Sequence, residues 1–155
     1  DRINRMLPEA KLIVLLRDPT QRFLSGYFYK KQKENHKHIK YPPLEEVVLA
    51  EGFENSETLL SQLYLPKLKM YNDYYERGNL LVIKSGDYFK SPEKILSQIC
   101  DYLNIDSEYK FPSIKSRNRA VLREPVSEEI VEKLDAAFAP HNELLYKYIN
   151  RDLGW

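Results

Sequence analysis

The sequence predicts an α/β fold in which helices flank a parallel sheet. Residues 12–17 and 80–84 contain short, continuous apolar runs, which are typical of strands buried on both faces. The segments around them carry apolar residues at helical spacing. Strands that are separated by helices favour parallel pairing through a right-handed crossover. Two strands are few for such a sheet, so we expect further strands outside this stretch.

The other predicted elements follow from caps, breakers and apolar spacing. They are a helix end at residues 1–7, a helix at 19–32, a polar loop at 33–43, a short helix at 44–50 closed by Gly52, a helix beginning near Ser56, a helix at 66–77 ended by Gly78, a helix at 92–103, an irregular basic stretch at 104–125, a helix capped by Ser127, and a last helix opening at Pro140.

The helix at residues 19–32 has a clear beginning. Asp18 is a good N-cap residue, and Pro19 suits the first helical position. Gln21 stands where a capping-box partner would lie. One face of this helix can pack on the sheet, and it carries Phe23, Leu24, Tyr27 and Phe28.

The opposite face of the same helix carries groups that suit an anion. It presents Asp18, Arg22, Ser25 and Tyr29, while Arg17 ends the preceding strand. Ligands of open α/β sheets bind beyond the carboxyl ends of the strands, so Arg17, Ser25 and the positive helix end could hold a phosphate. The alternative is structural: Asp18 and Arg22 form an i, i+4 pair, and Ser25 is a surface hydroxyl.

Residues 17–25, R-D-P-T-Q-R-F-L-S after an apolar strand, resemble the 3′-phosphate-binding segment of sulfotransferases that use 3′-phosphoadenosine 5′-phosphosulfate (PAPS). Nearly the whole chain resembles the heparan sulfate sulfotransferases, particularly the 3-O type. The order and spacing of several stretches carry this resemblance. They are residues 36–46, 64–68, 71–75, 80–83, 85–87, 91–93 and 102–105, Asn142, and residues 151–155.

The resemblance implies the sulfotransferase form of the P-loop-containing nucleotide hydrolase fold, with residues 1–155 as the carboxy-terminal portion of the domain. It implies transfer of a sulfuryl group from PAPS to an acceptor hydroxyl or amine, with a saccharide as the favoured acceptor. The product is 3′,5′-adenosine bisphosphate (PAP), and no metal is required. Arg17 and Ser25 would bind the 3′-phosphate. Arg117 and Arg119 would close over the cofactor from a second loop, in which Arg117 replaces the family's lysine and Asn118 its glycine.

The family's 5′-phosphosulfate loop and catalytic base are expected upstream of residue 1. The chain has 5 glycines, none of them in a G-x-x-x-x-G-K pattern, and it starts at Asp1 inside a predicted helix. We therefore expect this stretch alone to be inactive, and we assign no catalytic base. Two alternatives stay open: a non-catalytic module that binds an anionic glycan or nucleotide, and a P-loop kinase of related architecture.

Composition narrows the function classes only slightly. With 43% hydrophobic and 30% charged residues the chain is ordinary for a globular domain, and a net charge of +1 gives no argument for nucleic acid. Basic residues gather at 30–40 and at 110–123, where they could receive an acidic substrate and an anionic cofactor or could simply be solvated. No apolar run is long enough to span a membrane. The sequence does not predict an oligomeric state.

Cysteine and histidine usage bears on compartment and metals. Cys100 is the only cysteine, lies on an apolar helix face and is expected to be buried and inert. Without an intrachain disulfide a cytoplasmic setting is favoured, or the Golgi lumen for an animal-type relative. His36 and His38 have no third ligand nearby, so they do not predict a metal site.

Overall fold

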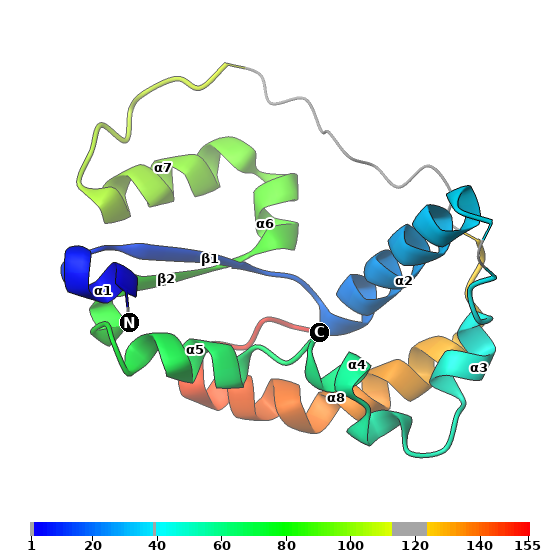
Figure 1. Cartoon of the computed structure of the whole chain (residues 1–155). Helices are drawn as coiled ribbons and strands as arrows, with labels where there is room; N and C mark the ends of the chain where they lie inside the picture. Colours follow the sequence, from blue (N-terminus) through cyan, green and yellow to red (C-terminus); the bar gives the residue numbers. More distant parts are fainter. Residues whose placement is uncertain (1, 39, 113–123) are drawn as a thin grey trace. The chain divides into compact units, whose positions relative to one another are not determined.

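The structure, a computed structural model, describes residues 2–38, 40–112 and 124–155 (Figure 1). It divides the chain into two compact units. Unit 1 comprises Asp1–Arg17 and Pro66–Arg117, and unit 2 comprises Asp18–Leu65 and Asn118–Trp155.

Unit 1 is built on a two-stranded parallel sheet. β1 (Leu12–Leu16) pairs with β2 (Leu80–Lys84), with Leu12 opposite Leu80 and Leu16 opposite Lys84. Its helices are α1 (Arg2–Met6), α5 (Leu65–Asn72, from Pro66 on in this unit), the 3₁₀ turn η2 (Arg77–Asn79), α6 (Ser85–Lys90) and α7 (Pro92–Leu103). Figure 1 shows β1 and β2 side by side, with α6 continuing directly from the end of β2. The predicted α/β fold with a parallel sheet flanked by helices is confirmed.

The last helix of unit 1, α7, follows its sequence signals closely. Pro92 begins it, Ile95 and Cys100 are buried on its apolar face, and Asn104 ends it with a positive φ of 60°. Beside this end, the Lys11 ammonium donates a hydrogen bond to the Tyr102 carbonyl at 2.5 Å. A cation at a helix carboxyl end satisfies an unpaired carbonyl and complements the helix dipole, so Lys11 stabilises the end of α7.

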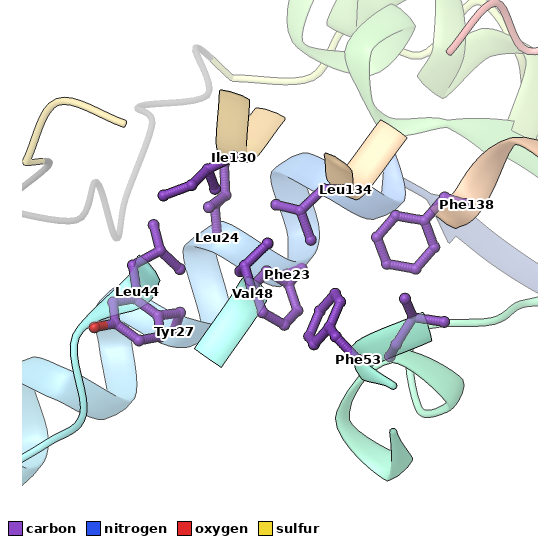
Figure 2. Packing of buried hydrophobic residues seen from close by; sticks show 10 residues of the cluster. Phe23, Leu24, Tyr27, Leu44, Val48, Phe53, Ile130, Leu134 and Phe138 are labelled. Atoms are coloured by element: carbon purple, nitrogen blue, oxygen red, sulfur yellow. The ribbon is translucent and has the colours of Figure 1, made fainter. Parts of the chain in front are cut away.

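Unit 2 is helical, and its hydrophobic core forms between distant segments of the chain. Its elements are α2 (Pro19–His36), α3 (Leu44–Val48), the 3₁₀ turn η1 (Phe53–Asn55), α4 (Glu57–Leu60) and α8 (Glu128–Ile149). Figure 2 shows side chains from α2, α3, η1 and α8 pointing toward one another. The buried core cluster consists of Phe23, Leu24, Tyr27, Leu44, Val48, Phe53, Leu59, Ile130, Leu134 and Phe138.

The apolar face predicted for α2 is confirmed, but its packing partner differs from the prediction. Phe23, Leu24 and Tyr27 are buried, and Phe28 packs against them partly buried. The cluster they join contains only residues of unit 2, whereas the sequence suggested that they pack on the sheet. Long-range helix partners cannot be read from the spacing of one helix.

Two helices are longer than predicted. α2 runs to His36 instead of residue 32, because Gln32, Lys33 and Glu34 are good helix formers. α8 continues through Pro140, where the sequence predicted a break and a new helix. An interior proline costs about 3 kcal/mol. Phe138 lies before the proline and Leu145 after it, on the same face of the helix, and both are buried. Their burial offsets that cost.

None of the helices in the described part of the chain has both the length and the apolar character needed to cross a membrane.

Candidate anion-binding site

The predicted phosphate ligands lie on either side of the link between β1 and α2. Arg17 directly follows β1 and is the last residue before unit 2 begins. Ser25 lies in the second turn of α2, where its side chain is half-buried. The structure therefore places an arginine just after a strand and a serine on the next helix. Their role as phosphate ligands stays a prediction.

The first turn of α2 is fixed at two points. The Asp18 carboxylate accepts a hydrogen bond from the backbone N–H of Gln21 at 3.2 Å, which confirms Asp18 as the N-cap. The buried Thr20 hydroxyl donates to Asp135 on α8 at 2.5 Å. The helix end beside Arg17 is therefore held within unit 2 by a cap and by a side-chain bond between helices.

Arg22 has a partner that the sequence did not suggest. Its Nη1 donates to the Gln62 carbonyl at 3.2 Å, and its guanidinium carbon lies 5.0 Å from the ring centroid of Tyr64. The sequence placed Arg22 on the anion-binding face or in a pair with Asp18. Its contacts instead join α2 to the segment that follows α4, so Arg22 contributes to the packing of unit 2.

The substitution Arg22→Ala is expected to lower the free energy of unfolding by about 1–2 kcal/mol, because it removes a charge-assisted hydrogen bond and a cation–π contact. Urea unfolding measures this, with the exposed Lys30→Ala on the same helix as the control. If Arg22→Ala keeps the stability of the wild type but no longer binds PAP, Arg22 is a ligand of the anion site and not a packing residue.

A surface pocket of about 570 Å³ opens along α2, starting at the residue after Ser25. It combines two ammonium groups, two phenol rings and one carboxylate. Its lining residues are Gly26, Tyr29, Lys30, Lys33, Glu34 and Tyr41. Ammonium groups attract acidic groups, and phenol rings offer flat apolar surface with a polar edge, so this chemistry suits an acidic ligand that contains rings.

The loop wall of this pocket is anchored to α2. The Tyr41 ring lies 5.3 Å from the Tyr27 ring, centroid to centroid, and the Tyr27 hydroxyl donates to the Pro42 carbonyl at 2.6 Å. The sequence singled out the basic cluster at residues 30–40 and the side chain of Tyr29, but it missed Tyr41. The only local signal was an aromatic residue directly before Pro42 and Pro43.

The ionisation of Tyr27 gives this packing a pH dependence. Burial, with added repulsion from Glu124 and Glu45, raises the pKa of Tyr27 to about 12, whereas an unfolded tyrosine titrates near 10. The stability that comes from neutral Tyr27 is complete below pH ~10 and is lost as the pH rises to about 12. Over that pH range we expect the free energy of unfolding to fall by about 1.4 kcal/mol per pH unit.

This loss should be absent in Tyr27→Phe and present in Tyr29→Phe, an exposed tyrosine of the same helix. Urea unfolding between pH 9 and 12 provides the measurement. Burial also raises the pKa of Tyr102 and Tyr146, but both residues remain in every variant. Equal slopes in wild type and Tyr27→Phe would contradict the assignment.

The second-loop prediction cannot be placed, because Arg117 and Arg119 lie outside the described residues. Glu124, which follows that stretch, is described. Its carboxylate accepts two hydrogen bonds from the Lys31 ammonium on α2, at 2.7 and 2.8 Å. Within residues 2–38, 40–112 and 124–155, no group of three or more His, Cys, Asp or Glu side chains could hold a metal ion.

A family model and several known proteins match this chain over most of its length. The family model described as Sulfotransferase domain matches residues 3–137. The chain is similar to heparan sulfate glucosamine 3-O-sulfotransferase 6 of Mus musculus, with 24% identity over 182 aligned positions that cover 99% of this chain and 52% of the mouse protein. It is also 31% identical over 97 residues to the membrane-associated sulfotransferase kil1 of Dictyostelium discoideum, covering 63% of this chain and 20% of that protein.

A solved structure shares the fold. The crystal structure of a sulfotransferase from Alicyclobacillus acidocaldarius superposes with a TM-score of 0.70 at 20% identity, covering 98% of this chain and 59% of that chain. The chain spans about half the length of the heparan sulfate 3-O-sulfotransferase that it matches, and less of kil1.

Proposed function

Because this chain belongs to the sulfotransferase domain family, we propose that the protein transfers a sulfuryl group from PAPS to an acceptor hydroxyl or amine. The supporting observation in the structure is Arg17 directly after β1, followed by the capped helix α2 that carries Ser25. In the reaction the acceptor atom forms a bond to sulfur, and the bond from sulfur to the bridging phosphate oxygen breaks. PAP leaves with that oxygen, and the acceptor loses its proton.

In this proposal Arg17 and Ser25 bind the 3′-phosphate of the nucleotide. A guanidinium can form two parallel hydrogen bonds to phosphate, a serine hydroxyl can form a third, and the amino end of α2 adds positive potential. The Asp18 cap and the Thr20–Asp135 bond hold that helix end in place before the ligand arrives. Arg117 and Arg119 supply further positive charge from the second loop. We assign the catalytic base to none of these residues.

The acceptor in this proposal is an acidic saccharide bound at the pocket along α2. Lys30 and Lys33 would meet its carboxylate or sulfate groups, and Tyr29 and Tyr41 would lie against its rings. The pocket begins next to Ser25, so it adjoins the proposed nucleotide site on the same helix. Support for a saccharide also comes from the mouse relative, whose name describes a heparan sulfate glucosamine sulfotransferase.

Nucleotide selectivity tests the proposal directly. We expect calorimetry to show that PAP binds more tightly than 5′-AMP, and that Ser25→Ala reduces this preference about tenfold, because a hydrogen bond to a charged group is worth about 1.5–3 kcal/mol. Ser97→Ala on α7 is also half-buried and serves as the control. Equal affinity of the wild type for PAP and 5′-AMP would refute the 3′-phosphate site. A native polypeptide that binds PAP but never converts PAPS to PAP would be a binding module.

Acceptor binding is tested separately. The double variant Lys30→Ala/Lys33→Ala should weaken binding of a heparan sulfate oligosaccharide several-fold at low salt, and the difference should shrink at high salt because exposed charges are screened. Lys90→Ala, an exposed lysine on α6, is the control. If both variants bind the oligosaccharide as the wild type does, the pocket is not the acceptor site.

A further inference from the structure

Gly26 lies in the interior of α2, where glycine is a poor helix former. Glycine destabilises a helix relative to alanine, because its backbone loses more conformational freedom on folding. Gly26 is far from both ends of Pro19–His36, so it is neither a cap nor a terminal residue. Its backbone is ordinary helix, without the positive φ that Gly52 adopts. The conformation of α2 therefore gives no reason for a glycine at this position.

The packing around Gly26 gives no reason for a glycine either. Gly26 is exposed, and a Cβ atom at this position would have no atom of the described residues within 4 Å, apart from its chain neighbours and its own helix backbone. A glycine that lets two parts of a protein approach closely would show such a contact. At Gly86 on α6, by comparison, a Cβ atom would lie 3.7 Å from the Lys84 side chain. The space above Gly26 is open, and a methyl group fits into it.

This open space belongs to the pocket along α2. Tyr29 and Lys30 follow Gly26 by one helical turn, so they are its neighbours on the helix surface. Helical side chains lean toward the amino end of their helix, so these two side chains extend toward the turn that contains Gly26. Both of them line the pocket together with Gly26. The lack of a side chain at position 26 therefore leaves the pocket deeper at the end next to Ser25.

The chemistry around this recess suits one ring of a saccharide. A helix backbone without a side chain presents a surface whose N–H and C=O groups are already hydrogen-bonded within the helix. The phenol rings of Tyr29 and Tyr41 can contact the apolar face of a sugar ring there. The part of α2 that lines the pocket runs from Gly26 to Glu34, which corresponds to about 12 Å along the helix axis. That length accommodates a second linked ring, whose acidic groups would meet Lys33.

We propose that Gly26 is a specificity-determining residue of the acceptor site, because its bare backbone contacts one ring of the acidic saccharide. A larger side chain at this position would occupy the place of the ring. This role rests on the proposed acceptor site, where Lys30 and Lys33 supply the charge and Gly26 supplies the space. α2 thus keeps a destabilising residue because the ligand needs the room that a side chain would fill.

Substitutions of increasing size at position 26 test this proposal in the native polypeptide. Gly26→Ala should raise the urea midpoint of unfolding by roughly 0.5 M, because alanine favours the helix and meets open space. Calorimetry with a heparan sulfate oligosaccharide should nevertheless show weaker binding in Gly26→Ala, and a loss of about tenfold or more in Gly26→Leu, which fills the recess. Asn35→Leu is the matched control, because it adds the same side chain at an exposed position of α2 that does not line the pocket. It should bind the oligosaccharide as the wild type does.

Three results would overturn the proposal, each for a different reason. A lower urea midpoint in Gly26→Ala would mean that the packing of α2 requires the glycine. Wild-type affinity of Gly26→Leu for the oligosaccharide, together with weak binding by Lys30→Ala/Lys33→Ala, would leave the acceptor pocket in place and remove Gly26 from it. Failure of the wild type to bind the oligosaccharide would refute the proposed acceptor itself, and the role of Gly26 with it.

Discussion

The substitution Phe138→Ala should lower the free energy of unfolding by about 3–5 kcal/mol, the range found when a buried phenylalanine is truncated. Phe138 is 1% exposed and lies in the unit 2 core, where α8 meets α2 and η1 (Figure 2). Its removal would leave a cavity among residues from segments far apart in the chain, which cannot all relax to fill it. Chemical denaturation followed by circular dichroism measures the change.

The control for this substitution lies on the same helix. Leu144 is 54% exposed, so Leu144→Ala should change stability by less than about 0.5 kcal/mol. Both variants place alanine in the interior of the same helix, and the main difference between them is the burial of the side chain that is removed. If both cost about the same, the side of α8 that faces the core would be wrongly assigned.

The substitution Arg17→Ala should weaken PAP binding about 10- to 100-fold while leaving 5′-AMP binding nearly unchanged. A charge-assisted contact to phosphate is worth about 1.5–3 kcal/mol, and only PAP carries the 3′-phosphate. Arg17→Lys should recover part of the loss, because lysine keeps the charge but cannot form the paired hydrogen bonds of a guanidinium. Calorimetric titration of both nucleotides measures the selectivity.

Arg2→Ala controls for the loss of one positive charge at an exposed site of the same unit. It should leave the preference for PAP intact. A parallel loss of affinity for PAP and 5′-AMP in Arg17→Ala would show that Arg17 supports the site generally and does not contact the 3′-phosphate.

The parts of the fold that the sequence predicted well are those governed by local chemistry. The two strands were recognisable because Leu12–Leu16 and residues 80–83 are short and continuously apolar. The beginning of α2 followed from Asp18 and Pro19, whose capping preferences depend only on nearby backbone. The family and its fold were recognisable from ordered motifs along most of the chain.

The parts that the sequence predicted poorly depend on contacts between distant segments. Nothing near Arg22 indicates that its guanidinium binds the Gln62 carbonyl. The continuation of α8 through Pro140 depends on burial at both ends of the helix, which outweighs the local breaking signal. Tyr41 reaches the pocket only because Tyr27 anchors the loop, so its place depends on the packing of that ring pair.

The hydrogen bond of Lys11 helps to specify the register in which β1 pairs with β2. A strand that is apolar at every position gains almost as much from burial when it is shifted by one residue, so its pattern alone specifies register weakly. A shift of one residue would move Lys11 about 3.3 Å along the strand direction and turn its side chain toward the other face of the sheet, away from the Tyr102 carbonyl to which it now donates at 2.5 Å. The misaligned strand would lose a charge-assisted bond and leave the last carbonyls of α7 without their cation. A single lysine outside the strand thus discriminates between alignments that five apolar side chains do not distinguish.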